Sequence, residues 1–191
     1  MSNFATDYKQ QLHSAIDTIP MDRVQQAIEW LDEALNEGRR VFTCGNGGSA
    51  STASHFICDM VKGASYNREK KFKMMALTDS LATITAYSND VSYDIVFVEQ
   101  LKNFALPGDI LICISGSGNS PNVLRATEWA NAAGLKTIGL TGRDGGQLGK
   151  LSQLEINVGV QHMGRIEDGH MFVCHMLAYY FMERAGGACG C

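Results

Sequence analysis

The chain has 191 residues, of which 45% are apolar and 19% charged, the ordinary balance of a soluble domain with a sizeable core. A net charge of −4 and the lack of any Lys/Arg-rich run exclude the electrostatic footprint of a general nucleic-acid-binding protein. No apolar run approaches the roughly 18 residues of a membrane span, and the first residues lack the basic and apolar parts of a secretion signal. We therefore expect a cytoplasmic protein that binds neither nucleic acid nor a membrane.

The chain opens with two predicted helices, in which apolar residues recur at helical spacing and Pro20 separates the two patterns. Short apolar runs typical of buried strands then alternate with helical stretches. The strands are predicted at 41–44, 74–77, 110–114, 137–140 and 154–158, and the helices at 4–18, 21–38, 49–62, 81–87, 91–104, 121–133 and 166–184. This alternation indicates one α/β domain, a doubly wound parallel sheet with an N-terminal helical pair.

A glycine-rich turn, residues 45–49 (GNGGS), follows the first predicted strand and opens a helix. Glycines let the backbone approach a ligand, and the free N–H groups of a helix N-terminus favour an anion. The turn has neither the spacing and lysine of a P-loop nor the GxGxxG pattern, which disfavours a nucleotide. We interpret it as a phosphate cradle, with a plain tight turn as the alternative.

A serine-rich loop, residues 115–120 (SGSGNS), follows the third predicted strand. Ser120 and Pro121 suit the N-cap and the first position of a helix. Capping needs only one hydroxyl, so three serines and two glycines indicate more, and hydroxyl and backbone N–H groups together suit a phosphate. The loop after the fourth strand, residues 141–146, is expected to be a surface turn without a direct role.

Acid/base or metal chemistry is indicated by a set of histidines and carboxylates. His55 and Asp59 are four residues apart and share a helix face, while Glu167, His170 and His175 fall in the last predicted helix. Such a set suits Zn²⁺ with an open position, or a general acid and base. A single histidine on an apolar helix is more often a core residue. Glu167 and His175 are also separated by about 12 Å of helical rise, so both reach one ion only if their side chains lean together.

The chain has six cysteines. Four of them lie in apolar or glycine-flanked segments and are predicted to be reduced core thiols: Cys44, Cys58, Cys113 and Cys174. Cys189 and Cys191 form a C-x-C tail, which cannot close a zinc site by itself and which we expect to be a frayed terminus.

In order and spacing, these motifs resemble the sugar isomerase (SIS) domain superfamily and, within it, the bacterial phosphoheptose isomerases. The resemblance runs nearly end to end and is carried by residues 44–49, 55–56, 89–90, 108–111, 114–120, 140–146 and 165–170. It implies a flavodoxin-like, five-stranded parallel sheet and a homotetramer with active sites at subunit interfaces. Residues 1–38 would form helices that pack on the domain and in the oligomer, and residues 39–191 would form the SIS domain.

The resemblance implies an aldose–ketose isomerase that converts D-sedoheptulose 7-phosphate to D-glycero-D-manno-heptose 7-phosphate through an enediol. Asp59 matches the base and His175 the acid. One Zn²⁺ per subunit would be held at the positions of His55, Asp59, Glu167 and His175. The substrate- and phosphate-binding positions of the family match Asn46, Gly47, Ser49, Asp90, Ser115, Gly116, Ser117, Ser120 and Glu167.

The chain departs from the family pattern in three places. Asp59 stands where the family has Glu, Glu167 where many members have Gln, and Lys62 and Gly63 where some members have an Arg nearby. Two alternatives follow: a SIS isomerase of another sugar phosphate, or a non-catalytic SIS regulator such as a partner of a replication-initiation factor. The filled base and acid positions argue against the regulator. The sequence leaves open the product anomer, the metal, the subunit that supplies each residue, and whether the heptose serves lipopolysaccharide or another conjugate.

Overall fold

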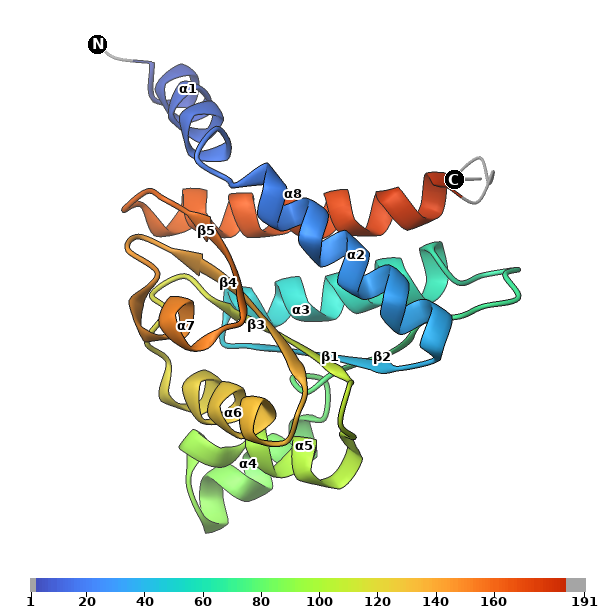
Figure 1. Cartoon of the computed structure of the whole chain (residues 1–191). Coiled ribbons are helices and arrows are strands. Elements are labelled where there is room, and N and C mark those ends of the chain that lie inside the picture. The colour runs from blue at the N-terminus through green and yellow to red at the C-terminus, as the bar shows by residue number, and fades with distance from the viewer. Residues whose placement is uncertain (1–2, 185–191) are drawn as a thin grey trace.

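A computed structural model describes residues 3–184 as a parallel β-sheet between two layers of helices (Figure 1). In chain order the elements are α1 (Phe4–Ile16), α2 (Met21–Glu37), β1 (Arg40–Gly45), α3 (Gly48–Cys58), the π-helical turn η1 (Asp59–Gly63), β2 (Lys73–Ala76), α4 (Leu81–Asp90), the 3₁₀ turn η2 (Tyr93–Ile95), α5 (Val98–Phe104), β3 (Ile110–Ser115), α6 (Pro121–Ala132), β4 (Lys136–Gly142), α7 (Gly146–Leu151), β5 (Leu154–Val158) and α8 (Met163–Arg184).

The sheet has the strand order β2-β1-β3-β4-β5, with every neighbouring pair parallel. This flavodoxin-like order confirms the predicted fold class. The chain runs from β1 outward to β2 and then crosses to β3 on the other side of β1. The carboxyl ends of β1 and β3 therefore flank the topological switch point, where open α/β sheets bind their ligands.

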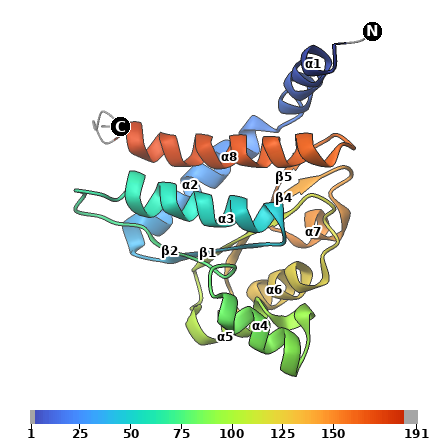
Figure 2. The ribbon, with the colours of Figure 1, turned by 180° about the vertical axis from the view of Figure 1, so that it is seen from behind.

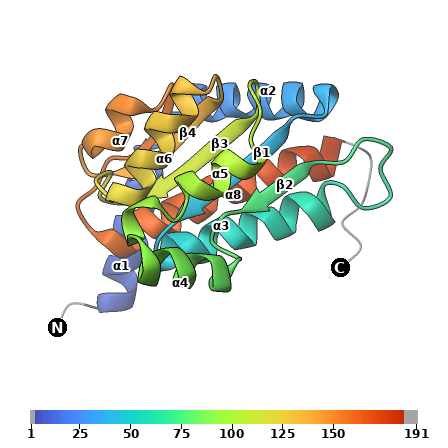
Figure 3. The ribbon, with the colours of Figure 1, turned by 90° about the horizontal axis from the view of Figure 1, so that it is seen from below.

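Side chains of successive strand residues point to opposite faces of the sheet, and both faces are covered. In β3, Ile110, Ile112 and Ile114 belong to a core with α2, α3 and α8, whereas Leu111 and Cys113 belong to a core with α5, α6 and α7. Figures 2 and 3 show these two helical layers on opposite sides of the sheet. Burial on both faces explains why the strands read as continuous apolar runs rather than alternating ones.

The two N-terminal helices differ in how far they are buried. α2 places the apolar residues Val24, Ala27, Ile28 and Leu31 in the core, and Gly38 ends it in a left-handed conformation at φ 68°. α1 buries only Ala15 of its thirteen residues and projects from the body of the domain (Figure 1). It contacts the start of α8, where the hydroxyl group of Tyr8 donates a hydrogen bond to Asp168 at 2.7 Å.

Several predicted helix bounds were wrong for local reasons. The predicted helix 49–62 changes to π-helix at Asp59, where the N–H of Ala64 donates to the carbonyl of Asp59 at 2.9 Å. The predicted helix 91–104 is divided, because the Ser92 side chain accepts a hydrogen bond from the N–H of Asp94 and starts a separate 3₁₀ turn. α7, which has two glycines in six residues, was not predicted, and α8 begins about one turn earlier than expected.

Three of the four cysteines predicted to be core thiols are buried and free: Cys44, Cys113 and Cys174. The prediction was wrong for Cys58, which is exposed. Its neighbours Phe56 and Met60 face the core, and a residue two positions away on a helix points to the opposite side. Cys189 and Cys191 lie outside the described residues. Within residues 3–184, no helix has the length and apolar character needed to cross a bilayer.

Candidate active site

The glycine-rich turn after β1 lies beside the end of β3, as the switch point requires. Gly45 is the last residue of β1 and pairs with Ile114 of β3. A Cβ atom on Gly45 would lie 2.8 Å from the Cβ atom of Ser49 and 2.9 Å from the carbonyl oxygen of Ile114, so only glycine fits there. The close approach brings the buried Ser49, near the N-terminus of α3, against the strand that carries the serine-rich loop.

The serine-rich loop gathers three hydroxyl groups at the N-terminus of α6. The Oγ atom of Ser115 lies 3.4 Å from that of Ser117 and 3.2 Å from that of Ser120. Ser120 occupies the N-cap position, as predicted, but its side chain makes no capping hydrogen bond. Its hydroxyl group faces that of Ser115 instead. Hydroxyl groups and free N–H groups at a helix N-terminus form an anion site without a cationic side chain.

The loop after β4 supports the serine-rich loop from behind. Gly118 has φ 65°, and a Cβ atom there would overlap the carbonyl group of Gly145. The N–H of Leu148 donates to the carbonyl of Gly118 at 2.8 Å, and that of Gln147 donates to the Asn119 side chain at 3.1 Å. The expected surface turn thus packs against the serine-rich loop and holds its shape.

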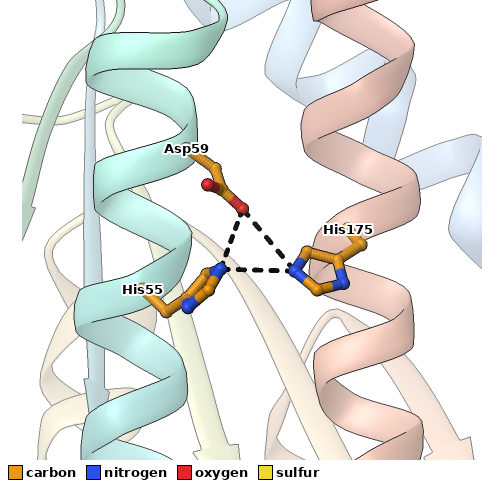
Figure 4. A group of neighbouring side chains, drawn as sticks. All are labelled: His55, Asp59 and His175. Atoms are coloured by element: carbon orange, nitrogen blue, oxygen red, sulfur yellow. Dashed lines mark hydrogen bonds and ion pairs between the residues drawn. The ribbon is translucent and has the colours of Figure 1, made fainter. Parts of the chain in front are cut away.

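His55, Asp59 and His175 point toward one another across the interface between α3 and α8 (Figure 4). The Oδ2 atom of Asp59 lies 3.3 Å from Nε2 of His55 and 3.8 Å from Nε2 of His175. The two Nε2 atoms are 3.3 Å apart. We call these three residues the His–Asp triangle. The sequence predicted that His55 and Asp59 share a face, and the packing of α8 adds His175.

The triangle has the dimensions of a metal site. Ligand atoms at about 2.0–2.2 Å from a tetrahedral Zn²⁺ lie about 3.3–3.6 Å from one another. The distances of 3.3, 3.3 and 3.8 Å fit three corners of such a tetrahedron. The side chains of His55 and His175 are 49% and 43% exposed, so the fourth corner is open to solvent. Two imidazoles, one carboxylate and an open corner are the donor set of a catalytic zinc site.

Glu167 and His170 lie apart from the triangle. A Cβ atom on Gly48 would stand 2.9 Å from Oε1 of Glu167, so this carboxylate faces the N-terminus of α3. Glu167 is not part of the triangle in the described chain, and its place in the predicted zinc-ligand set stays a prediction. His170, an acid/base candidate in the sequence, is a core residue. Its Nε2–H donates to the carbonyl of Thr141 at 2.9 Å, and burial lowers its pKa to about 4.

Two other predicted ligand positions have different surroundings. Asn46 is hydrogen-bonded to Asn122 of α6 and to Tyr93 of η2. Asp90, the last residue of α4, is exposed and accepts a hydrogen bond from its neighbour Asn89. Neither Asn122 nor Tyr93 was predicted from the sequence as a partner of Asn46. Asn122 could have been noticed as a polar residue in the first turn of a buried helix, but nothing in the sequence around Tyr93 points to Asn46.

A protein-family model described as the SIS domain matches residues 3–142 of this chain. The chain belongs to the SIS domain family. Among relatives, the phosphoheptose isomerase of Geotalea daltonii is 33% identical over 95% of this chain and 97% of its own length. That of Alteromonas mediterranea is 38% identical over 92% of this chain and 89% of its own. The chain is thus an enzyme of the phosphoheptose isomerase family.

Solved structures agree with this assignment. A phosphoheptose isomerase from Francisella tularensis has a TM-score of 0.87 at 29% identity, covering 96% of this chain and all of its own. The phosphoheptose isomerase GmhA from Neisseria gonorrhoeae has a TM-score of 0.85 at 30% identity, covering 93% and 96%. The sugar isomerase domain of an RpiR transcription factor from Sphaerobacter thermophilus, at 17% identity and a TM-score of 0.68, shares the fold alone. Because the SIS fold also occurs in a transcription factor, the fold alone does not determine the function, which depends on the residues of the site.

Proposed function

We propose that this protein is an aldose–ketose isomerase that converts D-sedoheptulose 7-phosphate to D-glycero-D-manno-heptose 7-phosphate through an enediol. The observation that carries the proposal is the His–Asp triangle. A domain that only binds a sugar phosphate does not need two imidazoles and a carboxylate grouped together and exposed to solvent. Membership of the phosphoheptose isomerase family supports the substrate class.

The proposed reaction moves protons between two adjacent carbons and their oxygens. Asp59 removes a proton from C1 of the ketose while His175 protonates the C2 carbonyl oxygen, which produces the enediol. The proton on Asp59 then returns to C2 and His175 takes the proton from O1, which leaves the aldehyde and restores both groups. Oδ2 of Asp59 faces the two histidines. Its other carboxylate oxygen can therefore act as the base.

The substrate phosphate would bind to the serine-rich loop. Ser115, Ser117 and Ser120 present hydroxyl groups within 3.4 Å of their neighbours at the N-terminus of α6. The turn at Gly47 and the buried Ser49 form the other wall, at the N-terminus of α3. Two helix N-termini and several hydroxyl groups stabilise a dianion, which matches a phosphate monoester.

We further propose one zinc ion per subunit, held by His55, Asp59 and His175. When bound, Zn²⁺ supplies Lewis acidity toward the oxygens of the sugar. Nε2 of His175 can bind a metal ion or carry a proton, but not both at once, so the acid role of His175 belongs to the metal-free site and the Lewis acidity of the metal would take its place in the zinc-bound one. Removal of the metal therefore distinguishes the two roles. If the metal-free protein is active, Asp59 and His175 act as base and acid without zinc.

We propose that the active protein is a homotetramer, in which residues 1–38 pack on the domain and in the oligomer and residues 39–191 form the SIS domain. Two features support assembly. α1 buries little of its surface in the single chain, and α8 exposes the aromatic side chains Phe172, Tyr179 and Tyr180, of which Tyr179 lies beside His175. A neighbouring subunit would cover the open side of the triangle and exclude water. Light scattering coupled to size-exclusion chromatography would give a mass of about one chain if this is wrong.

A different sugar phosphate is the alternative substrate. Asp59 is one methylene shorter than the Glu that the resemblance leads us to expect, and Lys62, on the same π-helical turn, stands in the region where an Arg was expected. Both differences alter the space and charge beside the reacting carbons. A panel of pentulose, hexulose and heptulose phosphates would favour this alternative if a shorter sugar gave the highest kcat/KM.

The decisive experiment follows sedoheptulose 7-phosphate by proton NMR with protein that is zinc-loaded, metal-free or reloaded. Appearance of an aldoheptose 7-phosphate supports the isomerase. Loss of turnover on chelation and its return with Zn²⁺ supports the metal. The variant His55→Gln should bind zinc more weakly than the wild type, because it removes one of the three proposed ligands. Folded, zinc-loaded protein that leaves every sugar phosphate unchanged would instead indicate a binding role.

A further inference from the structure

The side chain of Asn46 is held by two residues that approach it from other parts of the chain. Its Nδ2 atom lies 2.8 Å from Oδ1 of Asn122, and Nδ2 of Asn122 lies 3.0 Å from its Oδ1 atom. The Tyr93 hydroxyl group lies 2.7 Å from the same Oδ1 atom. Asn122 is only 1% exposed, so this amide pair is anchored in the core at the start of α6.

A backbone group determines which way both amides point. The N–H of Val123 donates to one side-chain atom of Asn122 at 2.9 Å, and a backbone N–H requires an acceptor. That atom is therefore Oδ1. The group of Asn46 that faces it must be the amide nitrogen, which leaves the oxygen of Asn46 facing the Nδ2 group of Asn122. The Tyr93 hydroxyl group, which also meets this oxygen, must donate.

This network leaves one free group on Asn46. Its oxygen accepts two hydrogen bonds, from Asn122 and Tyr93, and one of its two N–H groups is used by Asn122. Within residues 3–184, the second N–H group has no hydrogen-bond partner. Asn46 follows directly after β1, and its partner Asn122 is the second residue of α6, the helix that the serine-rich loop precedes. A group that only donates recognises an acceptor oxygen and does not bind a cation.

We propose that Tyr93 and Asn122 are positioning residues that hold Asn46 as an N–H donor to an oxygen of the sugar phosphate. The proposal rests on the isomerase function proposed above. Without Tyr93, the amide of Asn46 loses one of its two oxygen contacts and rotates more freely. The Tyr93 side chain is half-exposed on a short turn, so its hydroxyl group contributes little to the stability of the fold.

The first test is a double-mutant cycle on isomerase activity with Tyr93→Phe, Asn46→Ala and the double variant. Loss of one hydrogen bond that orients the donor should lower kcat/KM about three- to tenfold in Tyr93→Phe. The Tyr93→Phe change should have no further effect in the Asn46→Ala background, because the hydroxyl group acts through that amide. Tyr66→Phe, an exposed tyrosine on a loop, is the matched control and should keep wild-type kcat/KM. Wild-type activity in Tyr93→Phe, or effects that multiply in the double variant, would overturn the proposal.

A second test does not depend on turnover. In ¹⁵N-labelled protein, the side-chain amide signals of Asn46 are identified by their disappearance in Asn46→Ala. Tyr93→Phe should shift these signals and accelerate their exchange with water, while Tyr66→Phe leaves them in place. Unchanged Asn46 signals in Tyr93→Phe would refute the positioning role. A wild-type protein that turns over no sugar phosphate, yet shows the predicted shift, would contradict the isomerase function and retain the network.

Discussion

The serine-rich loop and the His–Asp triangle are built in opposite ways. The loop consists of six consecutive residues whose hydroxyl groups meet because the chain turns sharply between β3 and α6. In the triangle, His55 and His175 are separated by 120 positions and meet only because α8 packs beside α3. The loop is supported from behind by its neighbours, whereas the triangle is half-exposed. Local geometry therefore forms the proposed phosphate site, and tertiary packing assembles the proposed reactive one.

The largest effect should come from breaking the triangle without disturbing the loop. Asp59→Asn keeps the size of the side chain but removes the proposed base, so kcat should fall by about 10²- to 10⁴-fold. The matched control is Asp22→Asn on the exposed start of α2, which should keep full activity. Initial rates of the two variants and the wild type are measured by NMR, and circular dichroism verifies that each variant is folded. Wild-type turnover in Asp59→Asn would remove this residue from the chemistry.

His170 connects α8, which carries His175, to the end of β4, because its ring binds the carbonyl of Thr141. Burial lowers its pKa to about 4, from an ordinary value near 6.5, so the fold favours the neutral ring. Its contribution to stability is complete above pH 6.5 and is lost as the pH falls toward 4, by about 3 kcal/mol. His170→Gln keeps an N–H donor but cannot titrate. Urea unfolding between pH 4 and 7 should show a shallower loss of stability in this variant, and parallel curves would contradict the assignment.

Gly118 allows the loop to be broken while the triangle stays intact. In Gly118→Ala the added methyl group meets the carbonyl of Gly145 and φ stays positive, so the variant should lose about 2 kcal/mol more stability than Gly134→Ala. Gly134 also has a positive φ, 79°, but a Cβ atom added there would lie 3.6 Å from its nearest neighbour, an atom of Pro107. Both variants have the cost of a positive φ, but only Gly118→Ala has the steric overlap, so the difference in their free energies of unfolding, from chemical denaturation, measures that overlap. Equal losses of stability would show that the loop after β4 does not pack tightly against the serine-rich loop.

The smallest effect should come from a single hydroxyl group of the loop. Ser117→Ala removes one donor to the proposed phosphate and should raise KM about tenfold with little change in kcat. Ser14→Ala on the exposed face of α1 is the control. If KM is unchanged in Ser117→Ala, the hydroxyl group of Ser117 does not bind the phosphate. The serine-rich loop would then not be the proposed phosphate site.

Sequence patterns predicted the parts of this molecule that depend on local physics. The five strands and the glycine- and serine-rich turns were found because apolar runs and Gly/Ser clusters act within a few residues. The π-helical turn at Asp59 and the meeting of His55 with His175 depend on how α3 and α8 pack, which no local pattern reports. The contact of Tyr93 with Asn46 spans 47 positions and was missed for the same reason.

The position of His175 in the last helix also affects how the protein is made. Synthesis proceeds from the N-terminus, so the sheet strands and the serine-rich loop leave the ribosome before α8 does. A nascent chain that ends before α8 already has both glycine-containing turns but only His55 and Asp59 of the triangle. The His–Asp triangle therefore forms only after α8 has been synthesised, and a product that ends before α8 lacks both His175 and the core residues that α8 contributes.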